Sequence, residues 1–98
     1  MLRHIVMWKL KDFAEGHTKD ENKEIIKNNL EGLVGKIEGL LDLEVGKNFN
    51  PNGFDICLNS RFKDKDALAF YIDHPLHKQN QKYVKSVTCE RAVADYEI

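Results

Sequence analysis

The sequence predicts one α+β domain over residues 1–98, with the ferredoxin-like order β-α-β-β-α-β and a four-stranded antiparallel sheet covered by helices on one face. Three observations support this prediction. A chain of 98 residues, 42% apolar and 9% aromatic, is large enough for one hydrophobic core and too small for two. Four stretches alternate in hydrophobicity, and two others repeat apolar side chains every three or four residues. The six stretches follow one another in the order of this fold.

Residues 2–10 form the first predicted strand, in which both faces carry apolar side chains. A strand that is apolar on two sides must be covered on both. The alternate residues Leu2, His4, Val6, Trp8 and Leu10 are assigned to the side that the helices cover.

Residues 11–17 are expected to be a loop, and a capping box at Thr18 and Glu21 starts the first helix. The helix is predicted to end at Gly39, although two internal glycines weaken it by roughly 1 kcal/mol each relative to alanine. Packing against the sheet must therefore support its last turns. The buried stripe is predicted to be Ile26, Leu30, Leu33, Val34 and Ile37.

Residues 41–48 and 54–62 are predicted to be two further strands, and the intervening Asn-Phe-Asn-Pro-Asn-Gly segment favours a turn. Leu41, Leu43 and Val45 share one face of the earlier strand. In the later strand, the face directed at the helices is predicted to be Phe54, Ile56, Leu58, Ser60 and Phe62.

The second helical segment is expected to be broken at Pro75, because proline clashes with the preceding turn and offers no N–H donor. Asp64 caps its first part, in which Ile72 is predicted to pair with Leu68. Pro75 also suits the first position of a new helix, which makes His74 the N-cap of that helix. The inward stripe of the new helix is predicted to be Leu76, Asn80, Tyr83, Val84 and Val87.

Residues 88–97 are predicted to return as the fourth strand and to complete a sheet whose second face has no helix over it. That face is expected to carry Ile5, Met7, Cys57 and Val93, which a monomer would leave exposed to water. A homodimer that packs two such faces together is the simplest way to cover them.

Charged residues make up 32% of the chain but nearly cancel, which gives a net charge of −1. A nucleic-acid or anionic membrane surface needs a concentrated basic patch, so we expect neither partner. Lys9 and Lys11 interrupt the apolar N-terminal stretch before it reaches the length of a secretion signal or a membrane span, which predicts a soluble, cytoplasmic protein. Cys57 and Cys89 lack metal-ligand spacing and are expected to be free thiols.

Titratable side chains concentrate in residues 70–77, which place a phenol and two imidazoles on either side of the proline break. With an ordinary pKa of about 6.5, His77 can accept a proton at neutral pH. Tyr71 can donate its O–H to an oxygen on which negative charge develops. His4, on the first strand, either contacts a ligand or holds the His77 ring. The pocket between sheet and helices is predicted to be lined by His4, Val6, Trp8, Leu30, Leu58, Tyr71, His74 and His77.

Structural roles also fit these residues. A buried tyrosine hydroxyl bonded to an imidazole is a common way to satisfy polar groups, and His74 suits a helix cap. A metal site made of His4, His74 and His77 is disfavoured, because His-x-x-His has no partnering carboxylate and lacks the HExxH arrangement. No metal or cofactor is expected.

Four segments together give the chain a family resemblance. They are residues 3–12 (Arg-His-Ile-Val-Met-Trp-Lys-Leu-Lys-Asp), 43–48 (Leu-Glu-Val-Gly-Lys-Asn), 66–77 (Asp-Ala-Leu-Ala-Phe-Tyr-Ile-Asp-His-Pro-Leu-His) and 93–96 (Val-Ala-Asp-Tyr). In this order the chain resembles the stress-responsive A/B barrel domain family, and Tyr-x-x-His-Pro-x-His is the most specific part. The resemblance covers essentially the whole chain and implies a dimeric α+β barrel. In one branch, the plant polyketide cyclases, a Tyr and a His cyclise a linear polyketide thioester without metal or cofactor, and they correspond to Tyr71 and His77.

Three functions are compatible with these observations. The leading one is a homodimeric A/B barrel protein, with a role in stress as one interpretation, that binds a small and largely apolar ligand in a cleft between sheet and helices. The second is a cofactor-independent cyclase or isomerase with His77 as base and Tyr71 as acid. The third is a structural or protective dimer without a ligand. A filled environment around Tyr71 and His77 favours the third, and an open cavity favours the first two.

Overall fold

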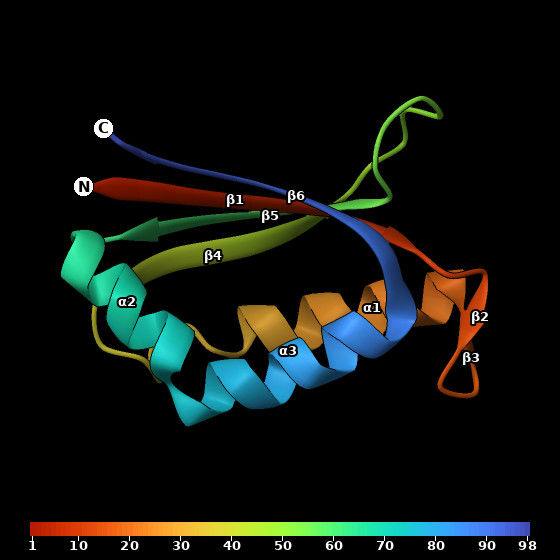
Figure 1. Cartoon of the computed structure of the whole chain (residues 1–98), viewed down its shortest axis with the longest axis horizontal. Helices are drawn as coiled ribbons and strands as arrows, with labels where there is room; N and C mark the ends of the chain where they lie inside the picture. The colour runs from red at the N-terminus through yellow and green to blue at the C-terminus, as the bar shows by residue number, and fades with distance from the viewer.

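The computed structural model describes residues 1–98, and it confirms the ferredoxin-like α+β fold (Figure 1). All strand pairs of the main sheet are antiparallel, in the order β4-β5-β1-β6. These strands are β1 (Leu2–Leu10), β4 (Leu40–Lys47), β5 (Ile56–Phe62) and β6 (Thr88–Glu97). The helices are α1 (Lys19–Glu31), α2 (Lys65–Asp73) and α3 (Pro75–Val87). None of the three is long and apolar enough to cross a membrane.

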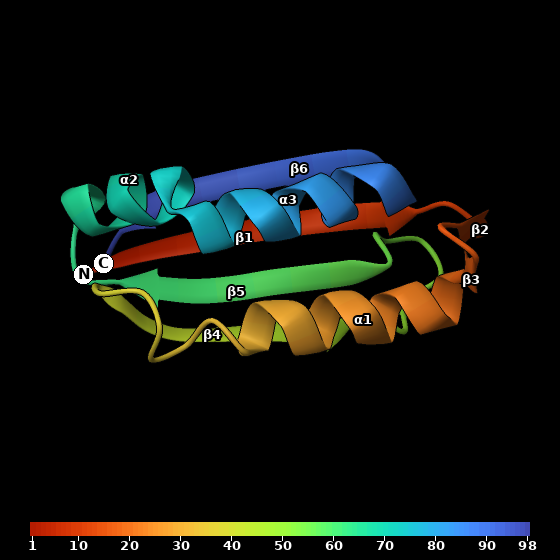
Figure 2. The same ribbon diagram turned by 90° about the horizontal axis from the view of Figure 1, so that it is seen from below.

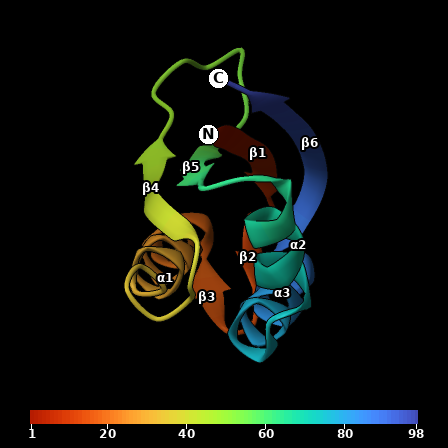
Figure 3. The same ribbon diagram turned by 90° about the vertical axis from the view of Figure 1, so that its left-hand side faces the viewer.

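All three helices lie on the same side of the sheet, which leaves its other face uncovered (Figure 3). Figure 2, viewed from the helix side, shows α1 running along β4, while α3 runs along β1 and β6. The core fills the space between these layers, because the inward side chains of the strands and helices are apolar. Its most deeply buried apolar side chains include Val6, Ile26, Val45, Ile56, Phe62, Tyr71 and Val87.

The capping box that starts α1 is confirmed. The backbone N–H of Glu21 donates to the Thr18 hydroxyl, and the Thr18 N–H donates to the Glu21 carboxylate over 2.8 Å. The preceding segment is not the predicted loop, because it forms a two-stranded hairpin of β2 (Phe13–Ala14) and β3 (His17–Thr18). Glu15 and Gly16 both adopt positive φ at its tip, as a tight hairpin turn requires.

Helix α1 ends earlier than the sequence predicts. It stops at Glu31, with Gly32 as the C-cap, and residues 33–39 form turns instead of further helix. Glycine is the least favourable residue for a helix interior after proline, which explains the early end. Leu33 and Ile37 still reach the core from these turns, whereas Val34 is exposed and does not belong to the buried stripe.

Strand β4 differs from the prediction at its start. The register with β5 shifts between Leu40 and Asp42, which turns Leu41 toward solvent and places Leu40 in the core. Such a bulge reverses the side-chain alternation locally, so period two alone gives the wrong face for Leu41. The inward positions of Leu43 and Val45 are as predicted.

The break between α2 and α3 lies where the sequence places it. Asp64 caps α2 by accepting a hydrogen bond from the Ala67 N–H over 2.8 Å, and Pro75 opens α3 after the extended residue His74. Leu68 is buried, but Ile72 is exposed, so the predicted Leu68–Ile72 core pair is wrong. Tyr71, three residues after Leu68, takes the inward position instead.

The face assigned to Val93 is also wrong. Val93 pairs with Val6, and residues opposite each other in a ladder share a face, so Val93 lies on the helix-covered side. It is nevertheless 49% exposed, because β6 is the edge strand of the sheet. The helix-free face carries Ile5, Met7, Cys57, Ala92, Ala94 and Tyr96. We call this set the open sheet face.

Candidate functional site

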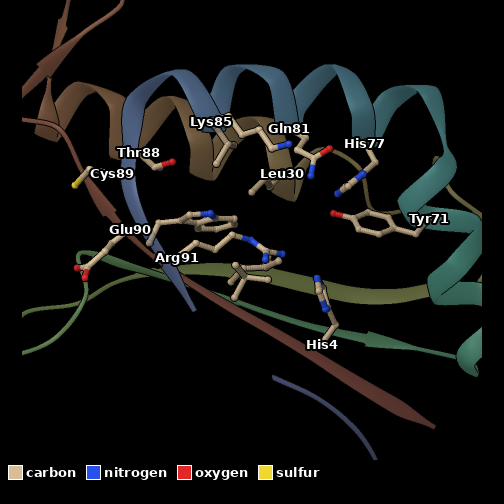
Figure 4. A pocket seen from close by; sticks show the side chains of 14 residues that line it. His4, Leu30, Tyr71, His77, Gln81, Lys85, Thr88, Cys89, Glu90 and Arg91 are labelled. Atoms are coloured by element: carbon tan, nitrogen blue, oxygen red, sulfur yellow. The ribbon is translucent and has the colours of Figure 1, made fainter. Parts of the chain in front are cut away.

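A cavity of about 250 Å³ lies between the helix-covered side of the sheet and the helices (Figure 4). Strand β1, helix α3 and the first residues of β6 supply most of its walls. Seven of the eight residues predicted to line a pocket line this cavity, namely His4, Val6, Trp8, Leu30, Leu58, Tyr71 and His77. The remaining lining residues are Gln81, Val84, Lys85, Thr88, Cys89, Glu90 and Arg91.

His74 is the one predicted pocket residue that the fold places elsewhere. Its Nδ1 accepts a hydrogen bond from the Leu76 N–H over 3.1 Å, and its ring packs edge-on against Phe70 at 5.6 Å between ring centroids. An N-cap side chain must turn toward the first turn of its own helix, which holds the imidazole outside the cavity. The three imidazoles therefore do not converge, and no group of three or more His, Cys, Asp or Glu side chains can hold a metal ion.

Tyr71 closes the inner end of the cavity. The last turn of α2 presents its ring to Phe62, at 5.0 Å between ring centroids, and the residue is only 1% exposed. The hydroxyl points toward the cavity (Figure 4). It makes no hydrogen bond to the protein, and because no fully buried polar side-chain atom lacks a partner, this oxygen is accessible from the cavity. Burial raises the pKa of Tyr71 to about 12, so the phenol stays protonated at neutral pH and is available as a donor.

His77 lies beside Tyr71, with 4.4 Å between the ring centroids. Its Nδ1 is 3.0 Å from the carbonyl oxygen of Ile72, and a carbonyl can only accept, so Nδ1 carries the hydrogen. Burial lowers the pKa of His77, and the charges of His4 and Arg91 act in the same direction, while the bond to Ile72 opposes them. The imidazole is therefore neutral at pH 7, with an unprotonated Nε2 that can accept a proton.

His4 reaches the cavity from the middle of β1. Only 6% of the residue is exposed, and its Nδ1 pairs with the carboxylate of Asp95, which lies opposite it on β6. Its ring is 6.4 Å from the Tyr71 ring, between centroids. The prediction that His4 lies on the helix-covered side is confirmed, but Asp95 rather than His77 is its partner. The carboxylate fixes the hydrogen on Nδ1 and leaves Nε2 for the cavity side.

Two groups of residues in and beside the cavity were not predicted from the sequence, for different reasons. Gln81 and Lys85 follow His77 at intervals of four residues, so helical periodicity alone would have placed all three on one face of α3. The lining residue Arg91 and the His4 partner Asp95, which does not line the cavity, depend on the pairing of β6 with β1, where they stand opposite Trp8 and His4. No local sequence pattern predicts which residue of β6 lies opposite which residue of β1.

The fold and the cavity together define a ferredoxin-like α+β domain with a pocket between its sheet and its helices. The chain belongs to the family described as Stress responsive A/B Barrel Domain, whose model matches residues 2–98. The family resemblance seen in the sequence is thereby confirmed.

Similar proteins extend this assignment. The chain is 33% identical to an uncharacterised protein of Streptomyces coelicolor over 100 residues, which cover 99% of each chain. It is also similar to a dimeric protein of unknown function with a ferredoxin-like fold from Bacteroides fragilis, at 33% identity, a TM-score of 0.78 and coverage of 99% and 95% of the two chains. A hydroxynitrile lyase from Passiflora edulis shares the fold, with a TM-score of 0.82 at 17% identity over 99% and 92% of the chains.

Proposed function

We propose that this protein binds a small molecule with a largely apolar body and one hydrogen-bonding end in the cavity beside Tyr71. The observation that supports the proposal most strongly is the Tyr71 hydroxyl, a donor on a buried side chain without a protein partner. One neutral hydrogen bond from this accessible hydroxyl to a ligand oxygen contributes about 0.5–1.5 kcal/mol to binding. A core packed tightly around Tyr71 and His77 would instead have favoured a purely structural dimer.

The composition of the cavity supports the same class of ligand. Val6, Trp8, Leu30 and Leu58 supply apolar walls, while the polar groups gather at the inner end and along one side. This mixture is typical of small-molecule sites, where a few polar groups fix orientation and apolar walls supply affinity. The volume of about 250 Å³ lies just below the range of roughly 300–1,000 Å³ seen for drug-sized ligands, so the ligand is expected to be smaller.

The proposal includes a second copy of the chain on the open sheet face. Ile5, Met7 and Tyr96 lie on this uncovered side, next to two alanines of β6. The connection between β4 and β5 projects on the same side, and its Phe49 is 98% exposed (Figure 1). The Bacteroides fragilis protein of the same fold is described as dimeric. A homodimer covers all of these apolar groups at once.

The second candidate is a cofactor-independent cyclase or isomerase, and the states of Tyr71 and His77 favour it. An unprotonated His77 Nε2 can remove an acidic proton next to a carbonyl group. The protonated Tyr71 hydroxyl, on the adjacent ring, can then donate a hydrogen bond to the oxygen on which negative charge develops. The plant polyketide cyclases that the sequence resembles use a Tyr and a His in the corresponding positions.

Trp8 provides the readout for binding, because it is the only tryptophan and it lines the cavity. Titration with octanamide, a neutral chain ending in a carbonyl acceptor, is expected to change Trp8 fluorescence in a saturable way. Tyr71→Phe should weaken binding by up to about tenfold, since one neutral hydrogen bond contributes about 0.5–1.5 kcal/mol. Tyr83→Phe is the matched control, because the Tyr83 hydroxyl donates to Asn22 outside the cavity.

A second assay, with the variant His77→Gln, separates the two candidates. If the protein is an enzyme of the proposed type, it should accelerate deuterium uptake at the acidic carbon of 2,4-octanedione above the buffer rate, and His77→Gln should abolish the acceleration. Binding without acceleration leaves the ligand-binding proposal in place and removes the enzyme. Equal octanamide affinity in wild type and Tyr71→Phe would contradict the role given to the hydroxyl.

A further inference from the structure

Arg91 contributes a positive charge to the cavity wall. It stands opposite Trp8 in the β1–β6 ladder, so its side chain leaves the strand on the helix-covered side. Figure 4 shows the guanidinium directed along the cavity toward His4 and Tyr71, and Arg91 is one of the lining residues. The positive charge of Arg91 also contributes to the lowered pKa of His77, which agrees with a guanidinium near the inner end.

No acid of the protein neutralises this guanidinium. The two acidic residues nearest to it on β6 have other partners, because Asp95 pairs with His4, and Glu90 pairs with Lys9 at 3.1 Å. The other two arginines are engaged, Arg3 with the Asn59 amide oxygen at 2.8 Å and Arg61 with Asp42. Arg91 is an exposed residue, and its side chain has neither a hydrogen bond nor an ion pair within the protein. A second cation without a carboxylate partner, Lys85, lies on the α3 side of the same cavity.

We infer that Arg91 makes this cavity a site for small amphiphilic carboxylates. The inference rests on the proposed function, that the cavity binds a small molecule, and it names the chemical class. A planar guanidinium matches a carboxylate in a bidentate fashion, and such charge-assisted hydrogen bonds are about twice as strong as neutral ones. The Tyr71 hydroxyl is a further donor at the inner end, and the walls around Leu30 and Leu58 accommodate an apolar chain or ring.

The charges around the cavity also disfavour a cationic ligand. A cationic ligand would meet an uncompensated guanidinium and Lys85, and the two acids of the region are already paired. A single carboxylate group supplies a negative charge for Arg91 and is small enough for a cavity of about 250 Å³.

The test compares octanoate with octanamide, which have the same chain and nearly the same shape but differ in charge. Both are titrated against wild type, Arg91→Gln and Arg91→Lys with Trp8 fluorescence and calorimetry, at low and at moderate salt. Lys82→Gln is the matched control, because it removes the same charge from an exposed position of α3 outside the cavity.

Wild type is expected to bind octanoate about tenfold more tightly than octanamide, with a preference that falls as salt rises. Arg91→Gln should bring the ratio of the octanoate and octanamide affinities close to one. Arg91→Lys should retain part of the preference, and Lys82→Gln all of it.

Two failures are distinguishable. Equal affinity of wild type for octanoate and octanamide, or a preference that survives in Arg91→Gln, overturns the carboxylate inference while the cavity remains a binding site. If neither compound alters Trp8 fluorescence or gives heat, both the inference and the proposed function fail.

Discussion

Burial acts in opposite directions on the two rings that meet at the inner end of the cavity. Desolvation favours the uncharged form of any group, so it raises the pKa of Tyr71 to about 12 and lowers the pKa of His77. Both rings are uncharged at neutral pH for the same reason. The result is a hydrogen-bond donor next to a proton acceptor, a combination that is chemically suited to ligand recognition and to proton transfer.

The residue-scale prediction concerns the pKa of His77 in an NMR titration of the histidine rings. The wild-type value should lie below the ordinary 6.5. Arg91→Gln should raise it, because removing a nearby positive charge makes protonation easier. The groups that face His77 and remain in the variant are Tyr71, His4 and the Ile72 carbonyl.

Lys82→Gln again serves as the control and should leave the pKa of His77 unchanged. An unchanged His77 pKa in Arg91→Gln would show that the guanidinium points to solvent. The carboxylate inference would then lose its structural basis.

The break between α2 and α3 is what brings Tyr71 and His77 together. An α-helix turns by roughly 100° per residue, so on one continuous helix two residues six positions apart point roughly 120° away from each other. Pro75 interrupts the helix between them, and α3 starts in a new direction. The two rings then meet at 4.4 Å between centroids. A local helix stop thus creates the site.

At the scale of elements, the turns after α1 depend on two glycines with positive φ, Gly35 at 86° and Gly39 at 88°. A side chain at Gly35 would meet open space, whereas a Cβ at Gly39 would lie 2.5 Å from the Cβ of Ala67 in α2. Gly35→Ala should lower the free energy of unfolding by about 1–2 kcal/mol through backbone strain alone. Gly39→Ala should cost about 1–3 kcal/mol more, because α2 must move away.

Urea denaturation of the two variants measures this difference. Gly35→Ala is the matched control for backbone strain, since both glycines have nearly the same φ. If both substitutions cost the same, α2 does not pack against the turn as tightly as the structure shows.

At the scale of the whole molecule, the open sheet face is the surface that a single chain leaves uncovered. Ala94 and Val93 are exposed neighbours on β6 that point to opposite sides of the sheet, since Ala94 pairs with Ile5 and Val93 with Val6. A lysine placed at each of these two positions in turn therefore tests the proposed dimer, because only one of the two side chains lies on the open sheet face.

Wild type is expected to have twice the chain mass of 11.4 kDa by light scattering. Ala94→Lys should give a monomer, because it places an unpaired ammonium group inside the interface. Val93→Lys should leave the dimer intact, because its side chain lies on the helix-covered side. A monomeric wild type, or a dimer that tolerates Ala94→Lys, would exclude the open sheet face as the interface.

The sequence by itself determined most of the elements, although not the β2–β3 hairpin, and it singled out several residues of the candidate site. Alternation and helical spacing placed β1, β5, β6 and the broken α2–α3 segment, because local periodicity and proline chemistry decide them. His4, Tyr71 and His77 were found because each is a titratable side chain on an inward position of such an element. The early end of α1 and the bulge at Leu41 were not predicted. The first depends on turn formation after Gly32 and the second on the register between β4 and β5, and neither can be seen in the spacing of apolar residues.

Only the tertiary structure decided which strand residues face one another and where space is left unfilled. The period of a strand is two, so the sequence shows which residues alternate but not which partner they oppose. The pairing of β6 with β1 assigned Val93 to the helix side, joined Asp95 to His4 and brought Arg91 to the cavity. A cavity is a property of packing between layers, and its charge is set by residues far apart in the chain.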